Sequence, residues 1–208
     1  MLTHPGRSRA WLGLVETGLL DHLWPAANFT ESRRARAGDL LNHFDGTISF
    51  SLALAAILGD RPGLEIEDCC RALTCSNEHR EAALWLAAHQ ADLDEPSAIG
   101  LADLKRRMAH PSFGDLMRLA AARCAAMPDG QRRSNELRDR VAAIPPDSVE
   151  PTPLVTGADL LERGVPPGPL YSRVLDAIYT LQLEERICTR QQALAELARR
   201  VDSARGVG

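Results

Sequence analysis

The sequence has few aromatic residues and no runs of β-branched residues, and this excludes a sheet-rich fold. Only 4% of its 208 residues are aromatic, whereas alanine, leucine and arginine are abundant. Strong helix formers therefore dominate the chain. We expect an all-α protein in which a multi-helix body of stacked helices is followed by a small helical tail.

The sequence also lacks long apolar runs, paired cysteines and a surplus of positive charge. No stretch approaches the roughly 18–20 apolar residues that a membrane span needs, and no signal-peptide core opens the chain. The five cysteines form an odd-numbered set without the spacing of a disulfide framework. We expect a cytoplasmic protein with no membrane partner. The formal net charge of −4 excludes a globally basic nucleic-acid binder but allows a local basic patch.

Three groups of residues resemble metal sites in composition but lack the required pattern. Asp60 is a single carboxylate after Leu58 and Gly59, whereas a divalent ion needs several ligands. Asp92 and Asp94 are spaced like the carboxylates of two-metal sites, but no strand or Gly-Ser turn precedes them. A third group has no pair of short-spaced zinc ligands: Cys69, Cys70, Cys75, His79 and His89. We predict no catalytic residue and no metal site in this chain.

The C-terminal region predicts a helical hairpin with a Gly/Pro-rich turn. Thr156 and Asp159 form a helix-start signal, and Gly164 suits the left-handed residue that ends a short helix. Two prolines then prevent continuation, and Gly168-Pro169 opens the next helix. A second capping box follows at Thr189 and Gln192. The first backbone N–H groups of the helix after such a turn have no hydrogen-bond partner within the helix, and they favour the binding of an anion.

A proline-rich stretch at 145–153 predicts a stiff linker between two domains. We place a helical body at 1–144 and a helical tail at 154–208. The first part of the body, 1–25, reads as a helix and a turn.

The order of these motifs along the chain resembles the C-terminal half of bacterial class II tRNA nucleotidyltransferases, the family of CCA-adding enzymes and poly(A) polymerases. The N-terminal His4-Pro5-Gly6-Arg7 is similar to the family's passage from neck to body, and Phe113-x-Asp115-Leu116-x-x-Leu119 is similar to its body. The tail carries most of the resemblance, through Gly157, Asp159, Leu160, Gly164, Pro167, Gly168, Pro169, Leu175, Leu183, Ile187, Thr189 and Arg190.

The resemblance implies that 1–25 is a neck remnant and that the catalytic head is absent from residues 1–208. That head carries a Gly-Ser turn and an Asp-x-Asp pair on a strand, and any Mg²⁺ would belong to it. We therefore expect no cofactor in this chain and no nucleotide transfer by the chain alone. The head is expected outside these residues, in a longer polypeptide or in a separate one.

The resemblance further implies an RNA-binding body and tail, with tRNA or another structured RNA as the partner. The candidate RNA-binding residues are Lys105, Arg106, Arg107, Arg163, Gly164, Gly168 and Arg173. We expect binding to weaken with salt and to be lost on charge reversal at Arg106 and Arg107. The alternative is a helical interaction scaffold that docks on a partner protein, such as a separately encoded catalytic head. An exposed apolar patch within 1–23 would favour that alternative.

Overall fold

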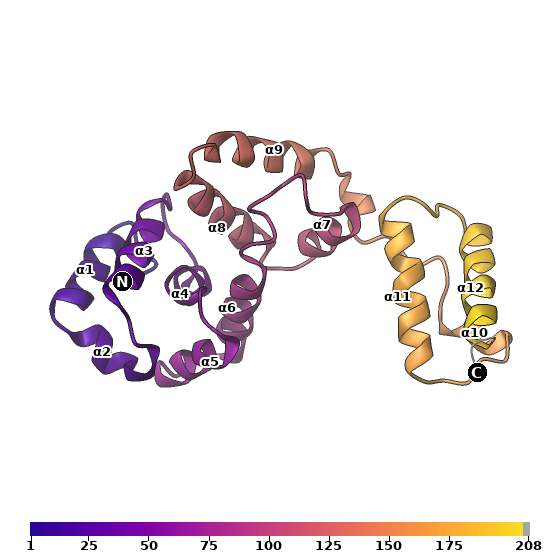
Figure 1. Cartoon of the computed structure of the whole chain (residues 1–208), viewed down its shortest axis with the longest axis horizontal. Helices are drawn as coiled ribbons and strands as arrows, with labels where there is room; N and C mark the ends of the chain where they lie inside the picture. Colours follow the sequence, from indigo (N-terminus) through magenta and orange to yellow (C-terminus); the bar gives the residue numbers. More distant parts are fainter. Residues whose placement is uncertain (206–208) are drawn as a thin grey trace. The chain divides into compact units, whose positions relative to one another are not determined.

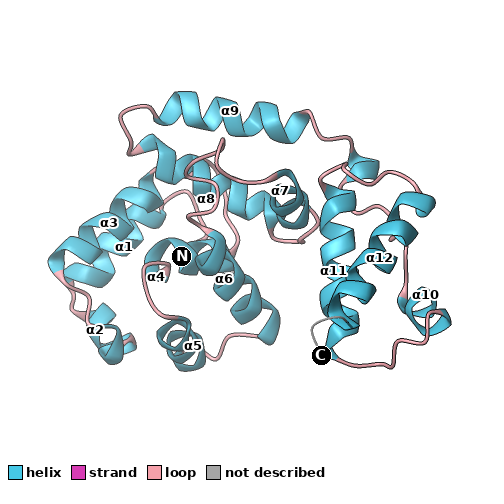
Figure 2. Ribbon diagram, turned by 45° about the vertical axis from the view of Figure 1, so that its right-hand side comes forward, coloured by secondary structure: helices cyan, strands magenta, loops and turns pink. Residues whose placement is uncertain are grey.

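The computed structural model describes residues 1–205, and every regular element in that range is a helix (Figure 2). It contains twelve α-helices and two short 3-10 turns, which confirms the all-α prediction. No helix in the described range is long and apolar enough to cross a membrane.

The chain forms two compact units (Figure 1). The first contains residues 1–98 and 111–140, and the second contains residues 99–110 and the chain from 141 onward. The chain therefore leaves the first unit, contributes one short helix to the second, and returns. Residues 99–110 pack with the C-terminal region. The sequence instead predicts that this segment belongs to the helical body.

The first unit is built around α4, whose residues are all buried except the half-buried Phe50. A helix that is apolar on every side is stable only inside a core. Helix α4 packs against α3, α6 and α8, and Ser49 caps it by accepting the N–H of Leu52 at 3.0 Å. The helices of this unit are α1 (Arg7–Glu16), α2 (Leu19–Leu23), α3 (Glu31–Asn42), α4 (Phe50–Leu58), α5 (Gly63–Ala72), α6 (Asn77–His89), α8 (Phe113–Ala125) and α9 (Gly130–Ala142), with η1 at Pro25–Ala27.

Two arginines hold the loop that leads into α4. Buried Arg7 donates to the carbonyls of Phe44, at 2.6 Å, and Gly46. Arg118 donates to the carbonyls of Asp45 and Thr47 at 2.8 and 3.0 Å. Burial and the charge of Arg118 lower the pKa of Arg7, which stays a cation at neutral pH. The Arg7 of the His-Pro-x-Arg motif is thus a structural residue here.

The second unit contains four helices, three of which form an apolar core. Helix α11 contacts α7, α10 and α12. The core draws on α10, α11 and α12, and includes Leu160, Val174, Ile178 and Leu197. The elements are α7 (Leu101–Met108), η2 (Pro146–Ser148), α10 (Gly157–Glu162), α11 (Pro169–Leu183) and α12 (Arg190–Arg205).

The predicted helix signals of this region are present. The Thr156 N–H donates to the Asp159 carboxylate at 2.7 Å. Thr189 and Gln192 bond reciprocally, through Thr189 N–H to Gln192 Oε1 at 3.1 Å and Gln192 N–H to Thr189 Oγ1 at 3.3 Å. Pro169 is the first residue of α11. The end of the proline-rich stretch lies against α11, because Tyr179 and Gln182 donate to the carbonyls of Pro151 and Thr152.

Candidate nucleic-acid interface

The Gly/Pro turn at 163–168 connects α10 to α11 on the surface of the second unit. Gly164 has a φ of +67°, the left-handed conformation that the sequence predicts. The N–H groups of Gly164 and Val165 donate to the carbonyls of Leu161 and Leu160 at 2.9 and 3.1 Å, which closes the helix end. Val165 is buried in the core, while the other residues of the turn are exposed.

Gly168, unlike Gly164, does not adopt a backbone conformation that requires glycine. Its φ of 170° is extended backbone that any residue adopts, and a Cβ at this position would meet nothing within 4 Å. The turn is fixed instead by Tyr171, whose hydroxyl donates to the Val165 carbonyl at 2.7 Å. Pro169 has no N–H, and Tyr171 N–H donates to the Gly168 carbonyl at 2.9 Å. Within residues 1–205, Leu170 N–H has no backbone partner and is available to an outside acceptor.

Arg173 lies one turn into α11 and is exposed. Side chains three positions apart on a helix lie next to each other, so the Asp176 carboxylate is placed where it could pair with Arg173. Asp176 is instead bound by Arg106, whose Nη2 lies 2.8 Å from its Oδ1. Within residues 1–205, Arg173 has no ion pair or side-chain hydrogen bond. It is therefore an uncompensated cation beside the Gly168 turn.

Arg163, the first residue of the turn, is exposed as well. Its Nη2 donates to the Leu194 carbonyl of α12 at 3.3 Å. The structure therefore brings Arg163, Gly164, Gly168 and Arg173 into one helix–turn–helix connection.

The three candidates on α7 are placed differently. Lys105 is 1% exposed, and its ammonium donates to Glu185 at 2.9 Å. Arg106 is half-buried and bonds both Asp176 and the Thr180 hydroxyl, at 2.8 and 2.7 Å. Arg107 is half-buried. Glu185 lies just beyond the end of α11, roughly 24 Å from Pro169 at about 1.5 Å per residue. Lys105 thus lies at the C-terminal end of α11, whereas Arg106 binds Asp176 in the middle of the helix, one turn beyond Arg173.

Charge in the second unit is balanced rather than basic. Residues 99–110 and 141–208 contain ten Lys or Arg and ten Asp or Glu residues, so their formal charge is zero. Arg190 binds Asp159, and Arg199 and Arg200 bind Glu196. The Thr156 N–H and the Arg190 charge lower the pKa of Asp159, and hydrogen bonds from Arg199 and Arg200 lower the pKa of Glu196. The Arg190–Asp159 pair links α12 to α10, the two Glu196 pairs lie within α12, and none of them involves Arg173.

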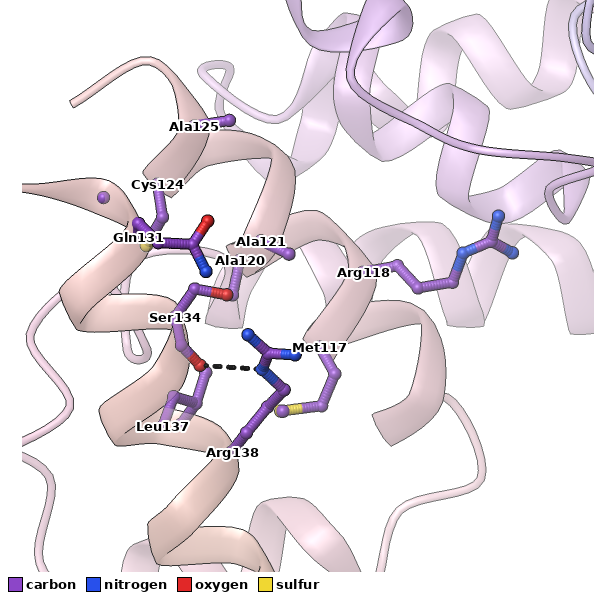
Figure 3. A pocket seen from close by; sticks show the side chains of 11 residues that line it. Met117, Arg118, Ala120, Ala121, Cys124, Ala125, Gln131, Ser134, Leu137 and Arg138 are labelled. Atoms are coloured by element: carbon purple, nitrogen blue, oxygen red, sulfur yellow. Dashed lines mark hydrogen bonds between the residues drawn. The ribbon is translucent and has the colours of Figure 1, made fainter.

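A second cationic surface lies in the first unit, between α8 and α9. The two helices line a cavity of about 520 Å³ without a carboxylate among its lining residues. Figure 3 shows Gln131 and Arg138 reaching from α9 into the space, with Met117, Ala120 and Ala121 of α8 opposite. Arg118 points away from it, toward the loop that it holds. Gly130 sets this corner, since a Cβ there would lie 1.7 Å from the Cys124 carbonyl oxygen.

The α9 residues of this cavity were not among the sequence candidates, although a signal exists. Gln131, Ser134 and Arg138 follow i, i+3, i+7 spacing and so share one face of the helix. What the sequence cannot indicate is that α8 lies opposite that face.

The carboxylates of the groups that resemble metal sites are engaged by other side chains. Asp60 lies 3.4 Å from both Arg33 and Arg36. Asp92 pairs with His89 at 2.9 Å, and Asp94 accepts from Arg123 Nε at 2.9 Å. Throughout residues 1–205, no three His, Cys, Asp or Glu side chains form a group that could hold a metal ion.

Comparisons of this chain with protein-family models, with curated proteins and with solved structures find no match.

Proposed function

We propose that this chain is an RNA-binding module that holds a structured RNA, such as tRNA, through its backbone phosphates. The observation that carries the proposal is Arg173, an exposed and uncompensated cation one turn into α11. A phosphate at this turn would meet the Arg173 guanidinium, the Leu170 N–H and the positive end of the α11 dipole together. The resemblance to tRNA nucleotidyltransferases supports the same reading.

Arg106 and Lys105 act indirectly in this proposal. Arg106 engages Asp176 and thereby keeps that carboxylate from neutralising Arg173. Lys105 is buried and fixes α7 on α11, so it positions the helix rather than contacting RNA. Charge reversal at Arg106 releases Asp176 and weakens binding for this reason, as well as through lost attraction to phosphates.

The α8–α9 cavity supplies a second contact in the first unit. Its lining combines hydrogen-bond donors from Gln131, Ser134 and Arg138 with an apolar floor of alanine and methionine, and no lining carboxylate repels a phosphate. The proposal assigns binding to this chain and no catalytic step.

The test is RNA binding by Arg173→Glu, measured by fluorescence anisotropy with a labelled tRNA transcript in low salt. The matched control is Arg71→Glu, which reverses an exposed arginine that pairs with Asp68 in the first unit. We expect Arg173→Glu to weaken binding and to lower the salt slope by about one, as loss of one phosphate contact should. Equal affinities for the two variants would exclude the turn as the phosphate site.

A further inference from the structure

The groove between α1 and α3 in the first unit is separate from the RNA surfaces described above. It encloses about 710 Å³ and is lined by α1 through Ser8, Trp11, Leu12 and Val15, and by α3 through Ala35 and Gly38 among others. The lining residues of α1 follow i, i+3, i+4, i+7 spacing, so they form one stripe along the helix. The groove therefore runs along both helices instead of crossing them.

The floor of this groove is already formed. Trp11 is buried, its Nε1 donates to the Arg34 carbonyl at 3.0 Å, and its ring packs edge-on against Phe29 at 5.8 Å. Gly38 lets α3 approach closely, since a Cβ there would lie 3.3 Å from Trp11 Cδ1. A rigid floor means that an occupant loses little free energy in ordering the site.

The rim of the groove combines apolar surface with negative charge. Leu12 lines the groove and is 56% exposed, so it offers apolar surface to an occupant. Glu31 and Asp39 also line the groove, are exposed, and have no ion-pair partner in residues 1–205. Arg34 is the cation of the lining, and its Nη2 is held by both Asp21 oxygens at 2.8 and 2.9 Å.

This combination identifies the chemistry of the occupant. The carboxylates repel phosphate, so the groove is unsuited to RNA, and they attract lysine or arginine. The stripe from Glu31 to Asn42 spans about 16 Å of helix axis, enough for three turns of a third helix laid in the groove. The small lining residues Ser8 and Ala35 leave room for its backbone to approach.

We propose that the α1–α3 groove binds a basic amphipathic helix of a partner protein. The apolar stripe of that helix packs on Leu12, Val15 and Ala35, and its flanking lysines or arginines face Glu31 and Asp39. This interaction does not depend on RNA binding, because none of these residues belongs to the RNA surfaces.

The test uses two labelled helical peptides of about 14 residues, long enough for four turns. Both carry the same leucine stripe, flanked by lysine in one and by glutamate in the other. Anisotropy titrations with the full chain should show saturable binding of the lysine peptide and at least about tenfold weaker binding of the glutamate peptide. The double variant Glu31→Lys, Asp39→Lys should reverse that preference.

Leu12→Asp should lose at least about tenfold in affinity for the lysine peptide without lowering the melting temperature, because Leu12 is not in the core. Leu64→Asp is the matched control, as Leu64 is 75% exposed on α5 of the same unit. It should bind the peptide like the wild type.

The proposal is overturned if the lysine peptide does not bind, if Leu12→Asp binds it as well as Leu64→Asp does, or if both peptides bind equally. It is also overturned if the chain dimerises in sedimentation experiments and Leu12→Asp abolishes the dimer, which would make a second copy the occupant.

Discussion

The ammonium group of Lys105 lies 2.9 Å from a carboxylate oxygen of Glu185, a residue 80 positions later in the chain. Lys105 is almost fully buried, whereas the Glu185 side chain is 59% exposed. The two partners are therefore not equivalent. Removing the lysine removes a buried charge, while removing the glutamate leaves that charge buried without its partner.

This asymmetry predicts the effects of two substitutions on stability. Glu185→Ala should lower the free energy of unfolding by about 1–3 kcal/mol, the cost of leaving a buried donor without its partner. Lys105→Met should cost less, because methionine keeps the apolar stem that packs on the core. Urea unfolding of the full chain measures both. A larger loss for Lys105→Met than for Glu185→Ala would contradict this account of the pair.

The Asp159 carboxylate predicts a pH dependence of stability. The Thr156 N–H and the Arg190 charge hold its pKa below the ordinary value of 3.8. A carboxyl whose pKa is lowered on folding stabilises the folded state above the unfolded pKa, and this contribution is lost as pH falls through the folded pKa. Asp159→Asn should therefore destabilise the chain at pH 7 by about 0.5–2 kcal/mol, and the difference from the wild type should narrow below about pH 4.

Thermal unfolding at pH 7 and pH 3 tests this expectation. Asp147→Asn is a suitable control, because Asp147 is an exposed carboxylate of the same unit. A difference between wild type and Asp159→Asn that persists unchanged at pH 3 would show that the carboxylate charge does not stabilise α10.

The cysteines should differ widely in reactivity, because the thiolate is the reactive form. Burial raises the pKa of Cys69 to about 11 and that of Cys70 to about 12, and it also raises the pKa of Cys124. Cys188 is exposed. At pH 8 a disulfide reagent such as Ellman's should react rapidly with Cys188 and reach these three buried thiols only on unfolding.

The control for this reactivity is the double variant Cys75→Ser, Cys188→Ser, because Cys75 is half-buried. It should remove the fast phase and leave the slow one. A fast phase that survives in this double variant would contradict the burial of Cys69, Cys70 and Cys124.

Local signals in the sequence were enough to predict the helix ends. The Thr189–Gln192 capping box and the left-handed Gly164 depend on residues a few positions apart, and the structure confirms both. The burial of Lys105 depends on packing between α7 and α11, which are far apart in sequence. A partial signal existed, because Leu101, Leu104, Lys105 and Met108 follow i, i+3, i+4, i+7 spacing and place the lysine on the apolar stripe.

The candidate RNA-binding residues also show that local sequence signals do not predict contacts between helices that are far apart in sequence. The turn that joins Arg163 to Arg173 could be predicted, since it is a short continuous segment. The ion pair between Arg106 and Asp176 could not be predicted from the sequence, because it forms only when α7 packs on α11. Whether a surface cation is free or already neutralised is a property of tertiary structure.

The most direct test of the central claim is the salt dependence of tRNA binding by the full chain. Anisotropy titrations should be carried out between 50 and 200 mM salt. If two or three phosphates are contacted, the affinity should fall by about 10- to 40-fold across this range, because each contact releases condensed counterions. An affinity that stays flat, or an absence of tRNA binding at the lowest salt concentration, would contradict the phosphate-binding account.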